Sequence, residues 1–248
     1  MLERNIKLII EYKGTNYYGF QKQPNFVTIQ GELEKALKQL FQQEIKVTGA
    51  GRTDAGVHAK GQVVNFRISH PRSLEEIQRA LNALLPDDIK VREVACVPLS
   101  FHARLNAKSR VYQYAILNRK FPSAFLKEFT AFFPYNLMID KMRAGAEYLL
   151  GTYDFRAFSA CQRTDPPKSF VRTISRIEIA RLGDLVILEI EANSFLYKMV
   201  RIITGTLLRV GRGKMPPEYV KEILLSCRRE LAGPTLPPNG LCLLAVKY

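Results

Sequence analysis

The stretch VTGAGRTDAGVHAKGQVVNF, residues 47–66, joins two apolar runs through a loop rich in glycine. Four glycines surround a single acidic residue, Asp54. The runs 44–50 and 62–69, which flank the loop, have the apolar pattern of strands. Glycine permits tight turns and lets a ligand approach the backbone closely. We therefore predict a strand–loop–strand unit that presents one carboxylate.

The elements around this unit give the first half of the chain the order β-α-β-β-α-β. Thr28 is the expected N-cap of the first helix, and Ser73 and Glu76 form a capping box that opens the second helix, which Pro86 stops. The predicted strands are 5–12, 44–50, 62–69 and 88–97, and the predicted helices are 28–43 and 73–85.

The second half repeats the same order with two additions, a helix at 216–227 and a loop region at 155–170. A hairpin with a Gly183-Asp184 turn is expected in its middle. The remaining predicted elements are strands at 110–117, 172–192 (the hairpin) and 240–248, and helices at 139–151 and 194–211.

This repetition predicts an α+β fold of two tandem ferredoxin-like units. Their sheets are expected to join into one mixed or antiparallel sheet, with helices on one face and an open cleft on the other. The boundary is expected within 98–109, so that an N-terminal domain (1–103) carries the Asp54 loop and a C-terminal domain (104–248) follows.

The charge balance indicates the class of partner. Among 248 residues there are 37 Lys and Arg against 23 Asp and Glu, a formal net charge of +14 spread along the whole chain. Such a surplus favours a polyanion, with nucleic acid first and an acidic membrane surface second. A merely soluble basic protein is the plain alternative.

The cysteines and the N-terminus indicate the compartment. Cys96, Cys161, Cys227 and Cys242 form no C-x-x-C pair, which argues against zinc, and they are interpreted as reduced core thiols. The first residues lack a signal-peptide pattern, and no apolar run is long enough to span a bilayer. We expect a cytoplasmic protein.

The glycine-rich loop does not fit the standard phosphate-binding motifs. A dinucleotide fingerprint would need glycine at Asp54, and a P-loop ending at Gly61 would continue with Lys and Ser or Thr instead of Gln62 and Val63. In an extended segment the side chains of Arg52 and Asp54 would project together, toward an approaching base. A surface hairpin with an ordinary turn aspartate is the alternative.

Several runs of the chain resemble the tRNA pseudouridine synthase A family. The most specific is GRTDAGVHA at 51–59, on an unusual loop, and the likeness covers nearly the whole chain. Two departures are Asn65, where many members have His, and TLPPNG, which varies a common TAPxxG pattern. The other matching runs are RVYQYAI (110–116), FLYKMVRIITGTLLRVG (195–211), FHAR (101–104), YDFRAF (153–158) and AGPTLPPNGLCLLAVKY (232–248).

The resemblance implies the isomerisation of uridine to pseudouridine in the anticodon arm of tRNA, at about positions 38 to 40. It also implies a homodimer that holds the tRNA across both subunits, with no cofactor and no metal. The composition and spacing by themselves indicate only a basic two-unit α+β protein with an exposed acidic loop.

The reaction needs one ionised carboxylate, because it consumes no water and involves no redox change. Asp54 is the candidate nucleophile, or the base that drives cleavage. Attack at C6 of the base, attack at C1′ of the sugar and removal of a ribose proton all remain open. The base must first flip out, and Arg52 is a candidate for filling the vacated space or holding a phosphate. An ordinary phosphate-facing arginine is the alternative.

Tyr112 and Arg201 match the other active-site residues of the family. Tyr112 would stack on the uracil, although strand alternation with Tyr114 also fits a core tyrosine. Arg201 lies in an apolar helix and needs a partner, and the family pairs it with the catalytic aspartate, which it would keep ionised. Lys198 could serve instead, and an arginine that reaches solvent is the alternative.

His58 is not assigned as a general base, because this chemistry does not need one. It is expected to contact the RNA backbone or to cap a turn. Two other functions compete with the isomerase: a catalytically silent RNA-binding module, and a hydrolase with Asp54 as general base. The first lacks a contiguous aromatic RNP motif, and the second lacks an evident second acid or metal.

Overall fold

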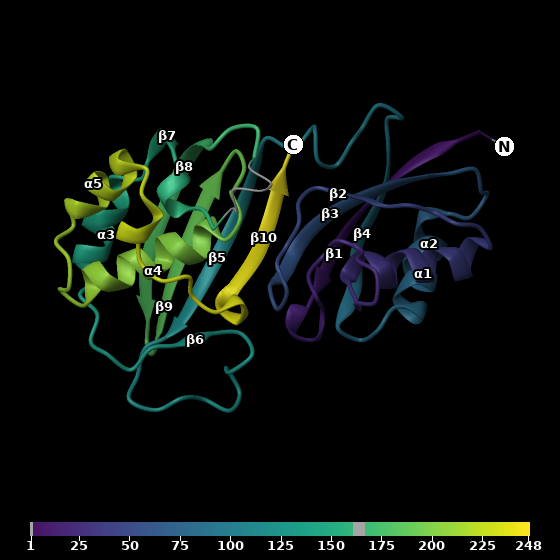
Figure 1. Cartoon of the computed structure of the whole chain (residues 1–248). Helices are drawn as coiled ribbons and strands as arrows, with labels where there is room; N and C mark the ends of the chain where they lie inside the picture. Colours follow the sequence, from purple (N-terminus) through teal and green to yellow (C-terminus); the bar gives the residue numbers. More distant parts are fainter. Residues whose placement is uncertain (1, 161–166) are drawn as a thin grey trace. The chain divides into compact units, whose positions relative to one another are not determined.

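The computed structural model describes residues 2–160 and 167–248 (Figure 1). Within them the chain forms ten strands and five α-helices, so the predicted α+β class is confirmed. The chain divides into two compact units, unit 1 (1–108 and 242–248) and unit 2 (109–241). Cys161 and the middle of the predicted 155–170 loop lie outside the described residues.

Unit 1 is a sheet whose one face is covered by two helices, which lie side by side in Figure 1. The strand order is β4-β1-β3, with antiparallel neighbours. β2 pairs antiparallel with β3, and β10 pairs parallel with it. The elements are β1 (Arg4–Tyr12), α1 (Ile29–Phe41), β2 (Thr48–Gly49), β3 (His58–Ile68), α2 (Leu74–Leu84), β4 (Ile89–Val97) and β10 (Leu241–Lys247).

Both helices of unit 1 begin as their sequences predict. The Thr28 hydroxyl accepts a hydrogen bond from the Gly31 N–H (3.2 Å). The Ser73 hydroxyl accepts from the Glu76 N–H (3.2 Å), and the Glu76 carboxylate accepts from the Ser73 N–H (2.7 Å). These side chains satisfy N–H groups that have no partner inside the helix, which places each helix start.

The strand predicted at 44–50 is wrong in extent, since the strand formed there, β2, comprises Thr48 and Gly49. Side chains of α1 form hydrogen bonds with the backbone groups of Val47 instead. Its N–H donates to the buried Glu34 carboxylate (3.2 Å), and its carbonyl accepts from the Gln30 amide (3.3 Å). A residue whose backbone groups are satisfied this way has no need of a neighbouring strand.

Unit 2 is a second sheet, of order β5-β9-β8-β7, with antiparallel neighbours and with β6 parallel to β5. Every residue of α4 except Arg209 is buried, so this helix forms the centre of the unit. The elements are β5 (Ser109–Leu117), β6 (Ala131–Phe132), α3 (Ile139–Glu147), β7 (Gly151–Asp154), β8 (Val171–Leu182), β9 (Leu185–Ala192), α4 (Met199–Gly211) and α5 (Tyr219–Ser226).

The short strands β6 and β7 and the start of α4 differ from the sequence prediction. The short strands β6 and β7 were not anticipated, because two and four residues carry too little periodicity to detect. The helix predicted from 194 begins at Met199, since Lys198 is left-handed with φ of 59°. The Gly183-Asp184 turn is confirmed, whereas the tandem ferredoxin-like arrangement stays a prediction.

One cysteine prediction is wrong. Cys96 is exposed rather than in the core. It lies on the edge strand β4, whose C-terminal half has no buried residue. Cys227 and Cys242 are partly buried, and burial raises the pKa of the Cys242 thiol to about 11. Among the described residues, no helix has the length and hydropathy that a membrane span needs.

Candidate functional site

Asp54 lies in the loop between β2 and β3 of unit 1, at the start of a tight turn. The Val57 N–H donates to the Asp54 carbonyl (3.1 Å), which closes a β-turn with Gly56 in its third position. Gly56 has φ of 78°, a left-handed conformation that side chains disfavour. This turn leaves the Asp54 side chain partly exposed at the loop surface.

The neighbouring Thr53 anchors the loop to the core. Its side chain is 6% exposed and its hydroxyl shares a hydrogen bond of 2.8 Å with the Tyr12 hydroxyl. Burial raises the pKa of Tyr12, which therefore stays neutral. The Thr53 carbonyl accepts from the Phe20 N–H (3.0 Å), and a Cβ on Gly19 would lie 2.6 Å from that carbonyl oxygen. These hydrogen bonds and the close approach of Gly19 hold the backbone next to Asp54 in place.

Arg52 and His58 lie in the same segment but in different surroundings. Arg52 is exposed, as the alternation Arg52–Thr53–Asp54 anticipates. His58 begins β3 and is 5% exposed, and its Nδ1 accepts a hydrogen bond from the Gly14 N–H (3.0 Å). This bond is a turn-capping contact, one of the two roles expected for this histidine.

Tyr112 lies in the middle of β5 in unit 2, paired with Ile190 of β9. Its ring meets that of Phe195 edge to face, with centroids 5.1 Å apart and planes at 86°. The side chain is 9% exposed, so its ring is largely covered. An aromatic pair in this geometry holds the ring in one orientation.

Tyr114, two residues further along β5, shows what a purely structural tyrosine does in this fold. It is fully buried, and its hydroxyl donates to the Pro237 carbonyl (2.7 Å). Burial raises its pKa, so the phenol remains protonated. The two tyrosines share the alternation that the sequence shows, but only Tyr112 reaches the solvent boundary.

Arg201 lies in the first turn of α4 and is 9% exposed. Its Nε donates to the Leu236 carbonyl (2.7 Å), and the Leu236 N–H donates back to the Arg201 carbonyl (3.3 Å). The Leu236 backbone therefore holds the guanidinium through its Nε, and the side chain does not extend into solvent. Lys198 lies just before the helix, with its ammonium 4.7 Å from the centre of the Tyr197 ring.

The sequence residues thus form two sets, each within one unit. Arg52, Asp54 and His58 belong to unit 1, and Tyr112, Lys198 and Arg201 belong to unit 2. Sequence reasoning missed the partners that hold them, namely Thr53, Phe195 and Leu236. The run 232–248 had been noted only as a resemblance. The pairing of Arg201 with Asp54 stays a prediction.

Within residues 2–160 and 167–248, no three His, Cys, Asp or Glu side chains are placed to hold a metal ion together.

Comparisons with known proteins agree with the resemblance. The family model described as tRNA pseudouridine synthase matches residues 8–106 and 146–248. The tRNA pseudouridine synthase A of Thermoanaerobacter sp. (strain X514) is 46% identical over 99% of this chain and all of its own length. That of Caldicellulosiruptor bescii is 43% identical over the same shares. A solved Cbf5-Nop10-Gar1 complex aligns with 96% of this chain and 57% of its own, at 12% identity and a TM-score of 0.38.

The family match and the full-length relatives lead to one conclusion. The chain belongs to the tRNA pseudouridine synthase family, whose members are isomerases that act on tRNA.

Proposed function

We propose that the protein converts uridine to pseudouridine at about positions 38 to 40, in the anticodon stem-loop of tRNA, with Asp54 as the catalytic group. The reaction breaks the N1–C1′ bond and forms a C5–C1′ bond, while C5 loses a proton and N1 gains one. Atoms balance without water or an oxidant, so a single carboxylate suffices as nucleophile.

The observation that carries this proposal is the construction of the Asp54 loop. Asp54 is partly exposed, while its neighbour Thr53 is tied to the core by its hydroxyl and its carbonyl. A carboxylate that the scaffold holds in place, yet leaves open to a ligand, meets the geometric requirement for a reacting group. The nine-residue match at 51–59 surrounds this residue.

The other residues receive supporting roles in the proposal. Tyr112 stacks on the flipped uracil, for which base–aromatic stacking contributes roughly 1–3 kcal/mol. Arg201 keeps the catalytic carboxylate ionised. Arg52 holds the tRNA in the flipped state, with Lys198 and His58 as further substrate contacts. Base flipping requires a few kcal/mol, which these contacts offset.

The test uses unmodified tRNA labelled with tritium at C5 of its uridines. Because the C5 hydrogen leaves when the C5–C1′ bond forms, turnover is measured as tritium released into water. Wild-type protein should release the label and place pseudouridine within positions 38 to 40. Asp54→Asn should lower the rate by at least about 10³-fold while its tRNA binding remains close to wild type.

The same experiment separates the competing functions. Tritium release by Asp54→Asn at the wild-type rate would remove this carboxylate from the mechanism. A wild-type protein that binds tRNA without releasing tritium would be the silent RNA-binding module. Release of free uracil or shortened RNA would instead identify a hydrolase.

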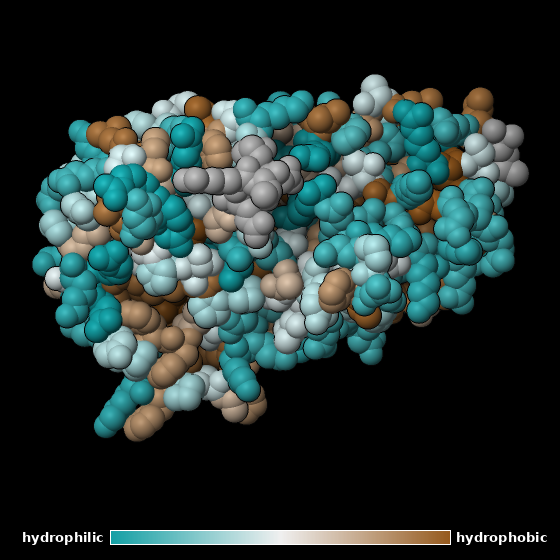
Figure 2. Space-filling model, in the orientation of Figure 1, coloured by the Kyte–Doolittle hydropathy of each residue, from teal (hydrophilic) through white to brown (hydrophobic). Residues whose placement is uncertain are grey.

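We also propose that the protein is a homodimer. The segment between β5 and α3 exposes several large aromatic side chains, including Phe125 at 93% and Phe121 at 65%. Apolar side chains stand beside hydrophilic ones over this protruding segment, at the lower left of Figure 2. Exposed apolar groups of this size favour an interface. Sedimentation should give twice the monomer mass, and Phe121→Ser with Phe125→Ser should shift it toward the monomer.

The proposed location is the cytoplasm, because the proposed substrate is tRNA. Fractionation of cells with an antibody against the protein would test it. Recovery with the membrane pellet after a salt wash would contradict this location.

A further inference from the structure

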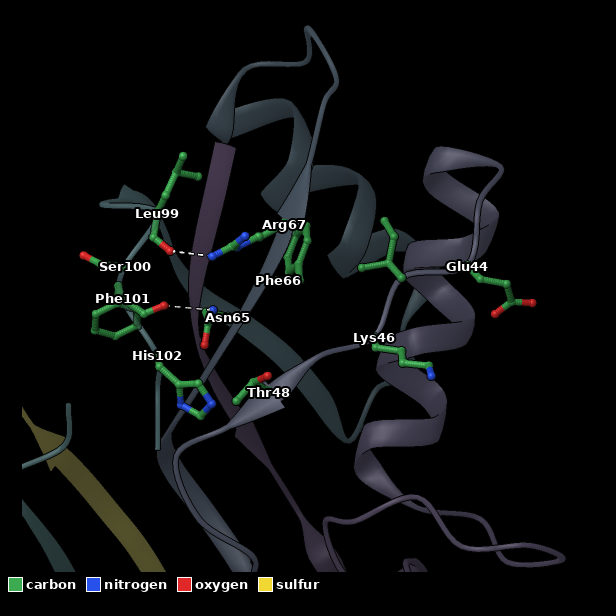
Figure 3. A pocket seen from close by; sticks show the side chains of 11 residues that line it. Glu44, Lys46, Thr48, Asn65, Phe66, Arg67, Leu99, Ser100, Phe101 and His102 are labelled. Carbon is green, nitrogen blue, oxygen red and sulfur yellow. Dashed lines mark hydrogen bonds between the residues drawn. The ribbon is translucent and has the colours of Figure 1, made fainter. Parts of the chain in front are cut away.

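Unit 1 contains a concave feature at the edge of β2 and the end of β3 (Figure 3). It is an open hollow with a volume of 390 Å³, near the lower end of the range for small-ligand sites. Its walls come from three segments that are distant in the sequence: the connection from α1 to β2, strand β3, and the loop that follows β4. We call it the β2 hollow.

The β2 hollow is lined by hydrogen-bond donors that nothing in the described chain uses. Lys46, Thr48 and Ser100 make no side-chain hydrogen bond or ion pair with any residue in 2–160 or 167–248. His102 directs Nδ1 toward its own loop, where it accepts from the N–H groups of Arg104 (3.2 Å) and Leu105 (3.3 Å). A neutral imidazole that accepts at Nδ1 carries its proton on Nε2. That N–H is also unused in the described ranges.

Figure 3 shows how these groups lie. Thr48 stands between the His102 ring on one side and the Lys46 side chain on the other. Lys46, Thr48 and His102 are all among the residues that line the hollow, and in this view the Lys46 side chain extends away from the other two. Donors of this kind bind an anion or a sugar hydroxyl.

The wall that carries His102 is fixed by two buried amides. Asn5 is fully buried and donates to the carbonyls of Pro98 (3.0 Å) and Phe101 (2.9 Å). Asn65 donates to the Asn5 side-chain oxygen (2.9 Å) and accepts from the Ala103 N–H (2.9 Å). Because both amides use all their donors on the protein, the loop 98–103 is held rigidly. This gives a structural role to Asn65, which departs from the family pattern.

The charges around the β2 hollow favour an anion. Glu44 is the acidic residue in its lining, and it forms an ion pair with Lys38. Arg67 is occupied by Glu3 (3.5 Å) and by the Leu99 carbonyl (2.8 Å). Lys46 is exposed and has no such partner among the described residues. The charge that remains uncompensated is therefore positive.

We propose that the β2 hollow binds a phosphodiester and its ribose on the tRNA, apart from the Asp54 loop. The inference rests on the proposed function, since it assumes that tRNA is the bound polyanion. Lys46 contacts the phosphate, and Thr48 and His102 donate to phosphate or ribose oxygens. Such a contact carries no base preference, so it positions the tRNA rather than selecting its sequence.

The test measures the affinity of fluorescently labelled tRNA at several salt concentrations. Lys46→Gln should make the slope of log K against log[salt] shallower by roughly 0.7–0.9, the value for one phosphate contact. At 0.1 M salt that change in slope corresponds to a roughly five- to eightfold weaker affinity. Turnover at saturating tRNA should be unchanged, so that the substitution raises KM and not kcat. Thr48→Val should weaken binding with little change in slope, because it removes no charge.

Lys35→Gln is the matched control. Lys35 is also an exposed lysine, on α1, and its ammonium lies 3.9 Å from the Glu32 carboxylate. If Lys46→Gln and Lys35→Gln have the same affinity and slope, the β2 hollow does not bind the tRNA backbone. If Lys46→Gln weakens tRNA binding more than Lys35→Gln does, but wild-type protein releases no tritium, the proposed isomerase function fails. The tRNA contact at the β2 hollow is then still supported. Thermal unfolding of each variant shows whether it is folded.

Discussion

The Asp54 loop of unit 1 and the helix α4 of unit 2 hold their charged side chains in opposite ways. Asp54 is partly exposed, and its position comes from backbone hydrogen bonds, the Thr53 anchor and a glycine with positive φ. Arg201 is 9% exposed among apolar residues, and packing and a hydrogen bond to the Leu236 carbonyl help to hold it. The main chain thus positions the Asp54 carboxylate, whereas packing in the interior positions the Arg201 guanidinium.

This difference determines how substitutions should act. Changing a partly exposed carboxylate should alter chemistry and leave the fold intact, because water already solvates part of the group. Changing a buried arginine removes packing and a charge-assisted hydrogen bond together. Substitution of Asp54 should therefore lower turnover with little change in stability, whereas substitution of Arg201 should lower both.

After Asp54→Asn, the largest effect is expected from Arg201→Ala. Loss of the guanidinium should slow turnover by on the order of 10²–10³-fold, while loss of its bond and packing should lower the free energy of unfolding by about 2 kcal/mol. Val210→Ala on the same helix is the control, expected to lower stability by a similar amount at nearly wild-type turnover. Tritium release and urea unfolding measure the two quantities. If stability falls but turnover does not, Arg201 is a structural residue.

The two tyrosines of β5 test whether exposure distinguishes function within one strand. Tyr112→Leu should lower kcat/KM by about 10- to 100-fold, through loss of base stacking. Tyr114→Phe removes only the hydrogen bond to the Pro237 carbonyl and should lower stability by about 1 kcal/mol with little effect on kcat/KM. Equal kinetic losses in the two variants would mean that Tyr112 acts through the core.

Glycine substitutions test the placement of Asp54 by its main chain. Gly56→Ala forces a side chain into a left-handed conformation and should lower stability by roughly 1–2 kcal/mol, with a turnover loss of about tenfold from the displaced turn. Gly183→Ala, in the β8–β9 turn with φ of 59°, imposes similar strain where an added Cβ meets no atom within 4 Å. Its turnover should match wild type. A similar turnover loss in both variants would point to a general loss of folded protein.

The smallest effect is expected from removal of divalent metal. The proposed mechanism uses a carboxylate and an arginine and no metal ion. EDTA should therefore leave the initial rate within about twofold of that of the untreated enzyme. The comparison needs tRNA that is already folded, since chelation also affects RNA. A rate that collapses with EDTA and returns on addition of one metal would contradict the proposed chemistry.

Much of the fold could be predicted from local pattern. The caps at Thr28 and Ser73 placed two helices, and the Gly183-Asp184 pair placed a hairpin turn, because each depends on residues close in sequence. The start of α4 differs from the prediction, because Lys198 has a left-handed conformation that the apolar spacing does not reveal. The strand expected at 44–50 is shortened to Thr48–Gly49, because side chains of α1 form hydrogen bonds with the backbone of Val47.

The sequence by itself determined the α+β class, the family and the candidate residues Asp54, Tyr112 and Arg201, because periodicity, charge and contiguous motifs are properties of the chain. The tertiary structure alone decided what surrounds them. It separated Tyr112 from Tyr114, buried Arg201 against Leu236, and gathered the unused donors of the β2 hollow. Exposure and hydrogen-bond partners depend on residues far apart along the chain, which no local pattern specifies.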